Sequence, residues 1–176
     1  MNAEELRTAQ TPLKENYRRD PQSAQYTFTS RGRLDADRLS VHIETGLGKV
    51  EAGLHAMAGG DGTLACSGDM LLEALVACAG VTLQAVATSM GIAIRGGRVT
   101  VQGDADFRGT LGIKAAGADK SAPVGCTAIR VHFDLDTQAT PEQLATLFKL
   151  TERYCVIYQT LQHSPAMTLT HAVTMA

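Results

Sequence analysis

The feature that most constrains the fold is a long apolar run from Asp69 to Gly91, which has the length and composition of one continuous helix. Ser67 is placed to act as its N-cap, Asp69 in the first turn complements the helix dipole, and Gly91 marks its end. A helix over 69–90 would be about 33 Å long, enough to cross a bilayer. However, Glu73 and Gln84 interrupt the run, and basic flanks are missing. We therefore expect a helix buried in a protein core or a dimer, and no membrane partner.

A second helix is predicted from Thr140 to Cys155. Thr140 is a good N-cap, Pro141 suits the first helical position, and Gln143 completes a capping box. The side chains that then share one face are mostly apolar: Leu144, Leu147, Phe148, Thr151 and Cys155. Cys155 is therefore expected to point inward.

Strand patterns lie on both sides of the long helix. Residues 109–125, rich in glycine and alanine, are expected to form a loop. Alternating or β-branched runs predict strands at Ala24–Ser30, Leu39–Glu44, Lys49–Leu54, Arg98–Phe107, Ala128–Leu135 and Met167–Met175. This order predicts an α+β fold in which a sheet wraps on the long central helix and the second helix. Residues 1–23 form an N-terminal arm with room for a short helix, and 24–176 form the domain.

Composition excludes several classes of protein. The 176 residues suit one domain, and the net charge of −2 gives no reason to expect a nucleic acid partner. Residues 1–21 are polar and charged, without the apolar stretch of a secretory signal, so we expect a cytoplasmic protein with reduced thiols. Paired Cys or His spacings typical of zinc sites are missing, so no metal and no cofactor are expected.

Four cysteines carry the chemical interest. Cys78 lies in the middle of the long helix and Cys155 at the end of the second. The two cysteines are either packed, inert thiols or a redox pair. Which of these two interpretations is right depends on whether the thiols meet in space. In the middle of a helix Cys78 gains nothing from that helix's N-terminus, so a reactive thiolate would need a nearby cation. Cys66 and Cys126 lie in segments flanked by glycine, where we expect loops.

Three other residues are candidates for acid–base or electrostatic roles. His55, just before a glycine-rich loop and near the start of the long helix, is the best acid–base candidate. Asp69 lies about 180° around the helix from Cys78, so it either caps its own helix or reaches a site built with a second subunit. Arg33 belongs to a group of upstream arginines, most of which are expected to be solvated.

The segment from Ser67 to Cys78, with its Ala- and Leu-rich stretch ending in cysteine, resembles the central helix of the OsmC/Ohr superfamily. Residues 154–161 resemble that family's second cysteine segment, and the likeness covers roughly residues 25–175. The resemblance implies an OsmC-like fold and an intertwined homodimer with its active site at the subunit interface. It also implies a thiol peroxidase that acts in antioxidant stress responses. Cys78 would attack an organic hydroperoxide, Cys155 would resolve the sulfenic acid as a disulfide, and an external dithiol would reduce that disulfide.

The sequence departs from the family pattern around the cysteines. The family usually has an Asn-Pro-Glu type segment at the start of the helix, where this chain has Cys66, Ser67, Gly68 and Asp69. By this resemblance, the carboxylate that orients the activating arginine is either shortened to Asp69 or absent, if Gly68 is the counterpart position. Arg33 is the best match for that arginine, with His55 in its region. The proline that usually follows the second cysteine is Val156 here.

Three functional hypotheses follow. The first is a peroxidase that reduces organic hydroperoxides through Cys78 and Cys155. The second is a non-catalytic dimer that binds a small molecule on the same scaffold, with structural cysteines. The third is a hydrolase or transferase in which Cys78 works with His55, which requires the two within hydrogen-bonding reach.

Overall fold

The computed structural model describes residues 2–19, 31–34, 40–45, 48–112 and 122–173, with 31–34, 40–45 and 48–49 described by their backbone. The predicted α+β class is confirmed. In chain order the elements are α1 (Ala3–Arg19), β1 (Arg31–Leu34), β2 (Ser40–Thr45), β3 (Gly48–Gly53), the 3-10 turn η2 (Ala56–Ala58), β4 (Ala65–Cys66), α2 (Ser67–Ser89), β5 (Ile94–Ala105), α3 (Phe107–Thr110), β6 (Cys126–Thr137), α4 (Pro141–Tyr154) and α5 (Val156–Gln162).

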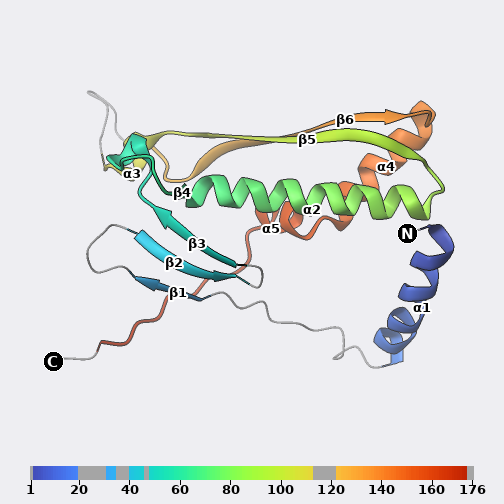
Figure 1. Ribbon diagram of the computed structural model, residues 1–176, viewed down its shortest axis with the longest axis horizontal. Coiled ribbons are helices and arrows are strands. Elements are labelled where there is room, and N and C mark those ends of the chain that lie inside the picture. Colours follow the sequence, from blue (N-terminus) through green and yellow to red (C-terminus); the bar gives the residue numbers. More distant parts are fainter. Residues whose placement is uncertain (1, 20–30, 35–39, 46–47, 113–121, 174–176) are drawn as a thin grey trace.

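The described strands form two separate sheets on either side of α2 (Figure 1). Strands β1, β2 and β3 form an antiparallel meander, and the short β4 pairs parallel to β3. Strands β5 and β6 form a long antiparallel ribbon that lies along α2, while α4 and α5 pack on α2 from another side. The central helix therefore packs mainly on the β5–β6 ribbon, α4 and α5, and it meets α1 and, through β4, the four-stranded sheet.

Helix α2 forms nearly where the sequence predicts it. Asp69 lies in its first turn, and the chain leaves the helix at Gly91, whose φ of 70° is left-handed and suits glycine. The predicted cap is wrong by one residue, since Cys66 is the N-cap and makes no side-chain capping bond, while Ser67 is already helical. The helix is long and apolar enough to cross a membrane. In this structure it packs against β5, α4 and α5, and 28% of its most apolar stretch is buried.

Helix α4 begins as predicted. The Thr140 side chain accepts a hydrogen bond from the backbone N–H of Gln143, the Gln143 side chain accepts one from the N–H of Thr140, and Pro141 occupies the first turn. Its inner face is buried, with Leu147 0% and Cys155 1% exposed. The helix stops at Tyr154, because Cys155 is extended with φ −73° and ψ 107°, and α5 starts directly after it.

The core consists of two apolar clusters along α2. One joins the C-terminal half of α2 to α4, through the buried residues Leu83, Val86, Ala87, Ile92 and Leu147. The other joins the middle of α2 to the start of α5 and to both strands of the ribbon, with Leu75, Ala79 and Cys155 fully buried and Cys78 packed against them. The second cluster places the two cysteines of interest together.

Several other predictions differ from the structure. Within 109–125, residues up to 110 belong to the short helix α3, and 113–121 lie outside the described residues, as does the strand expected at Ala24–Ser30. Residues 164–173 are not a strand, contrary to prediction. No described strand pairs with this segment, and Met167, Leu169 and Val173 are 88%, 90% and 75% exposed. An alternating pattern forms a strand only where a neighbouring backbone accepts its hydrogen bonds.

Candidate functional site

Cys78 and Cys155 meet in the structure although 77 positions separate them in the sequence. Cys78 lies in the middle of α2 and is partly exposed. Cys155 lies at the break between α4 and α5 and is buried. The break matters, because the extended backbone at Cys155 turns the first N–H groups of α5 toward α2. Both residues carry free thiols, so the structure represents the reduced pair.

The surroundings of Cys78 favour its thiolate. Burial alone raises the pKa of Cys78, but hydrogen bonding outweighs it and holds the pKa below its ordinary value. The donors are, in order of effect, the backbone N–H of Ile157, the Cys155 thiol, the Thr82 hydroxyl and the backbone N–H of Val156. Donors that face the charged form of an acid stabilise that form. Cys78 is therefore the more nucleophilic sulfur of the pair.

Cys155 has the opposite tendency. Burial raises the pKa of its thiol, and the neighbouring Cys78, as a hydrogen-bond acceptor and as a negative charge, raises it further. Backbone N–H groups of Tyr158 and Ile157 only partly compensate. The protonated Cys155 is thus a donor to the Cys78 thiolate. The two sulfurs divide the roles of thiolate and thiol within one site.

The electrostatic prediction for Cys78 was incomplete. A cation was expected to stabilise the thiolate, because Cys78 is in the middle of its own helix. In the structure, backbone N–H groups at the start of a different helix, α5, stabilise it. No arginine in the described part of the chain is among the groups that shift the pKa of Cys78. Two signals were available in the sequence. Thr82 is one helical turn after Cys78, so its side chain leans back toward that cysteine. Val156 replaces a proline, which would have no N–H to offer.

The other predicted site residues lie elsewhere. His55 and Asp69 line a pocket of about 230 Å³ at the start of α2, together with Cys66 and Glu73. The Nδ1 atom of His55 accepts a hydrogen bond from the Met57 N–H at 3.0 Å. Its ring stacks on that of Phe107, with centroids 4.8 Å apart. Nine residues of α2 separate Asp69 from Cys78, which corresponds to about 13 Å along the helix axis. Among the described residues, no group of three or more His, Cys, Asp or Glu side chains is arranged to hold a metal ion.

Arg33 and the two remaining cysteines complete the candidate set. Arg33 lies in β1, where its backbone pairs with His42 of β2, and its side chain is outside the described residues. Cys66 ends β4 and Cys126 begins β6, so neither lies in the loop expected for it. Neither is among the groups that act on Cys78. Of the five predicted residues, the described structure therefore brings Cys78 together with Cys155 and, at a separate place, His55 together with Asp69.

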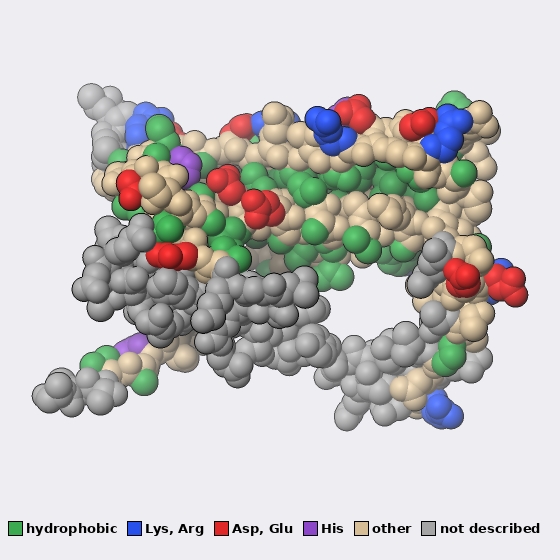
Figure 2. All heavy atoms as spheres, in the orientation of Figure 1, with side chains coloured by type: hydrophobic (Ala, Val, Ile, Leu, Met, Phe, Trp, Pro, Cys, Tyr) green, Lys and Arg blue, Asp and Glu red, His purple; other side chains and the backbone are tan. Residues whose placement is uncertain are grey.

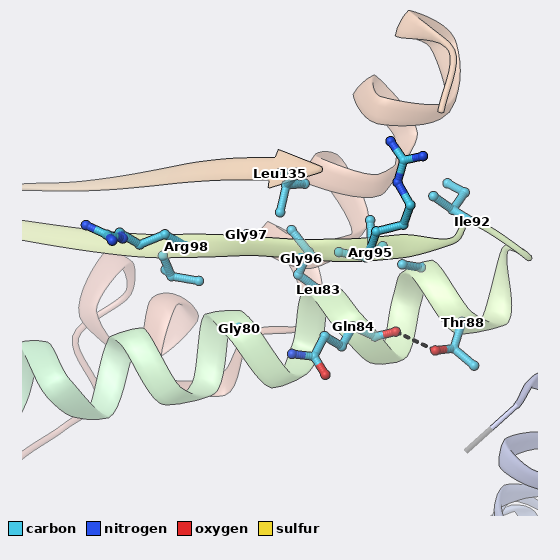
Figure 3. Close-up of a pocket in the computed structure, with 13 residues that line it drawn as sticks. Gly80, Leu83, Gln84, Thr88, Ile92, Arg95, Gly96, Gly97, Arg98 and Leu135 are labelled. Carbon is cyan, nitrogen blue, oxygen red and sulfur yellow. Dashed lines mark hydrogen bonds between the residues drawn. The ribbon is translucent and has the colours of Figure 1, made fainter. Parts of the chain in front are cut away.

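Three pockets differ in their relation to these thiols. A groove of about 390 Å³ lies between the C-terminal half of α2 and β5, with Gln84 and Thr88 on the helix and Arg95 and Arg98 on the strand (Figure 3). Neither cysteine lines this groove. A smaller pocket of about 220 Å³ lies among β6, α2, α4 and α5, and Cys155 is part of its wall. Cys155 also lines a third pocket, of about 430 Å³, together with Arg153, Val156 and His163. Cys155 therefore borders two pockets, and Cys78 borders neither of them.

Comparison with known proteins identifies the family of the chain. The family model described as OsmC-like protein matches residues 60–170, which include both cysteines. No curated protein matches the chain in sequence.

Solved structures share the fold at low sequence identity. An OsmC-like protein from Mycoplasma pneumoniae is 19% identical, with a TM-score of 0.58 over 80% of this chain and 90% of that one. An organic hydroperoxide resistance protein OsmC from Legionella pneumophila is 16% identical, with a TM-score of 0.58 over 80% and 92% of the two chains. An organic hydroperoxide resistance protein from Elizabethkingia anophelis is 15% identical, with a TM-score of 0.57 over 80% and 91%. At these identities the likeness establishes the fold.

Proposed function

The chain belongs to the OsmC-like protein family, and on this premise we propose that it is a thiol-dependent peroxidase that reduces organic hydroperoxides through Cys78 and Cys155. The observation that carries the proposal is the contact between two thiols whose pKa values are shifted in opposite directions. Structures of the same fold that are described as organic hydroperoxide resistance proteins support the choice of substrate.

The reaction begins at Cys78. Its thiolate attacks the terminal oxygen of the hydroperoxide, the O–O bond breaks, and the alkoxide leaves with a proton as the alcohol, so that Cys78 becomes a sulfenic acid. Cys155 then loses its proton and attacks the Cys78 sulfur. A disulfide forms and hydroxide leaves as water. The N–H groups of Val156 and Ile157 stabilise the Cys78 thiolate before the first step.

The proposal also includes a homodimer, which would give a role to the other predicted site residues. Hydrophobic side chains are exposed along α2, among them Leu71 at 41% and Val81 at 68% (Figure 2). We propose that a second copy covers this face and brings Arg33, Asp69 and His55 into its active sites. Size-exclusion chromatography with light scattering tests the dimer, and a monomer at micromolar concentration would contradict it. A cytoplasmic location is part of the same proposal, because the cycle must begin from reduced thiols.

A stopped-flow assay with cumene hydroperoxide tests the activity. The reduced protein is mixed with peroxide, and the cysteines are then identified by peptide mass spectrometry. We expect rapid formation of a Cys78–Cys155 disulfide, no turnover in Cys78→Ser, and unchanged turnover in Cys126→Ser, the matched control at an exposed cysteine. Retained peroxide consumption by a folded Cys78→Ser variant would refute the mechanism.

A further inference from the structure

Of the pockets that Cys155 lines, the one of about 220 Å³ has a distinct chemical character. Its walls are largely apolar and include Ala79, Val131 and the rings of Phe133 and Phe148, whose centroids are 5.7 Å apart. Cys155 contributes to the wall, whereas Cys78 does not. A molecule in this pocket therefore borders one sulfur of the pair.

The pocket also carries a negative charge. Glu152 of α4 lies in its wall beside Tyr158 of α5. Burial raises the pKa of Tyr158, and the charge of Glu152 raises it further, so this carboxylate lies close enough to act on another group of the pocket wall. Among the described residues, no Lys or Arg lines this pocket. An anionic molecule would be repelled there, while an uncharged one would not.

We propose that this pocket admits the reductant, that the reductant attacks Cys155 and not Cys78, and that the pocket selects an uncharged thiol over an anionic one. The inference concerns the second half of the catalytic cycle and rests on the proposed function. Displacement at a disulfide sulfur needs an approach to that sulfur from outside the S–S bond. Cys155 lines this pocket and also the 430 Å³ pocket beside Arg153, whereas Cys78 lines neither, so approach through either pocket leads to Cys155.

The surroundings of the two sulfurs also favour attack on Cys155. In thiol–disulfide exchange, the sulfur that leaves as the more stable thiolate leaves faster. Cys78 is the sulfur that the N–H groups of Val156 and Ile157 face, so it is the better leaving group. Although Cys78 is the more exposed residue, attack on it would expel Cys155 as a thiolate within an apolar cluster.

The electrons balance as follows. One thiolate of a dithiol attacks the Cys155 sulfur and forms a mixed disulfide, the Cys78–Cys155 bond breaks, and its electron pair stays on Cys78 as a thiolate. The second thiolate of the reductant then attacks the reductant's own sulfur in the mixed disulfide. The reductant leaves as a disulfide, and Cys155 takes up a proton. The dithiol is oxidised by two electrons and the protein disulfide is reduced by two.

The test uses the full chain, oxidised in parallel with cumene hydroperoxide and with diamide, so that reduction is followed separately from peroxidase activity. The probes are two monothiols, uncharged 2-mercaptoethanol and anionic mercaptoethanesulfonate, at matched thiolate concentrations. Iodoacetamide in the mixture alkylates the sulfur that leaves, and mass spectrometry locates the thiol adduct on the sulfur that was attacked. We expect the adduct on Cys155, the carbamidomethyl group on Cys78, and faster reaction with the uncharged thiol.

Removing the charge provides a matched comparison. Glu152→Gln should speed reduction by the anionic thiol about threefold relative to the uncharged thiol. Glu142 lies on the same helix, ten residues from Glu152 and about 15 Å away along the axis. Glu142→Gln should therefore leave that ratio unchanged.

The possible outcomes separate the two proposals. An adduct on Cys78, or equal effects of Glu152→Gln and Glu142→Gln, would overturn the inference. A disulfide formed by diamide but not by peroxide would refute the proposed function, while reduction at Cys155 in that sample would still support the inference. If neither oxidant links the two cysteines, both proposals fail.

Discussion

Replacing Leu147 by alanine should strongly destabilise the protein, because this side chain is the point where α4 meets the C-terminal half of α2. Leu147 is 0% exposed and lies in the cluster that contains Leu83 and Val86. Truncation to alanine removes about three carbon groups, worth about 0.8 kcal/mol each in transfer free energy, or about 2.4 kcal/mol. The cavity that remains adds to this, and measured Leu→Ala changes in cores of roughly 3–5 kcal/mol include both terms. We expect the free energy of unfolding to fall by about 3–4 kcal/mol.

Urea denaturation followed by far-ultraviolet circular dichroism measures this change. Protein concentration must be held constant, because the stability of a dimer depends on it. Leu111→Ala is the control, since Leu111 is 51% exposed, and its expected cost is below about 1 kcal/mol. A loss of less than about 1 kcal/mol for Leu147→Ala would refute the view that this contact joins the two helices.

Three further predictions concern the thiolate, a helix cap and the ribbon. Thr82→Val removes a hydrogen-bond donor to Cys78 and should raise the pKa of that thiol, so the midpoint of the pH dependence of Cys78 alkylation by iodoacetamide should move upward. Thr88→Val is the control, because the Thr88 hydroxyl donates to a backbone carbonyl, and it should leave that midpoint unchanged. Thr140→Ala removes a capping box and should cost about 1 kcal/mol in urea denaturation, and a change below about 0.3 kcal/mol would contradict the cap. Gly97→Ala would place its Cβ 2.3 Å from the Asp134 carbonyl oxygen, so it should lower the melting temperature by several degrees, and an unchanged melting temperature would show that the ribbon adjusts freely.

The sequence predicted best the elements whose causes are local. The capping box of Thr140 and Gln143 depends on side chains three residues apart, so it could be read directly and is confirmed. The inward direction of Cys155 follows from its spacing to Leu147, and both are buried. The α+β order and the central helix were likewise available from hydrophobic periodicity. The N-cap of that helix could not be predicted in the same way. Cys66 and Ser67 are adjacent, and which of them caps the helix depends on how β4 leads into it.

The C-terminal segment shows the limit of a periodic pattern. Met167, Leu169 and Val173 alternate as a strand would, yet no described strand pairs with this segment. A strand is stabilised by hydrogen bonds to a neighbour, and a neighbour is not a property of the segment's own sequence.

By itself, the sequence determined the class of the fold, the long central helix, the start of the second helix and the presence of two cysteines on packed faces. Only the tertiary structure decided that Cys78 and Cys155 meet, and that one favours the thiolate and the other the thiol. The physical reason is that a thiol's pKa depends on the donors and charges within a few ångströms of its sulfur. Here those donors come from Val156 and Ile157, far along the chain, and they reach Cys78 because the backbone breaks at Cys155 and a new helix begins against the middle of α2.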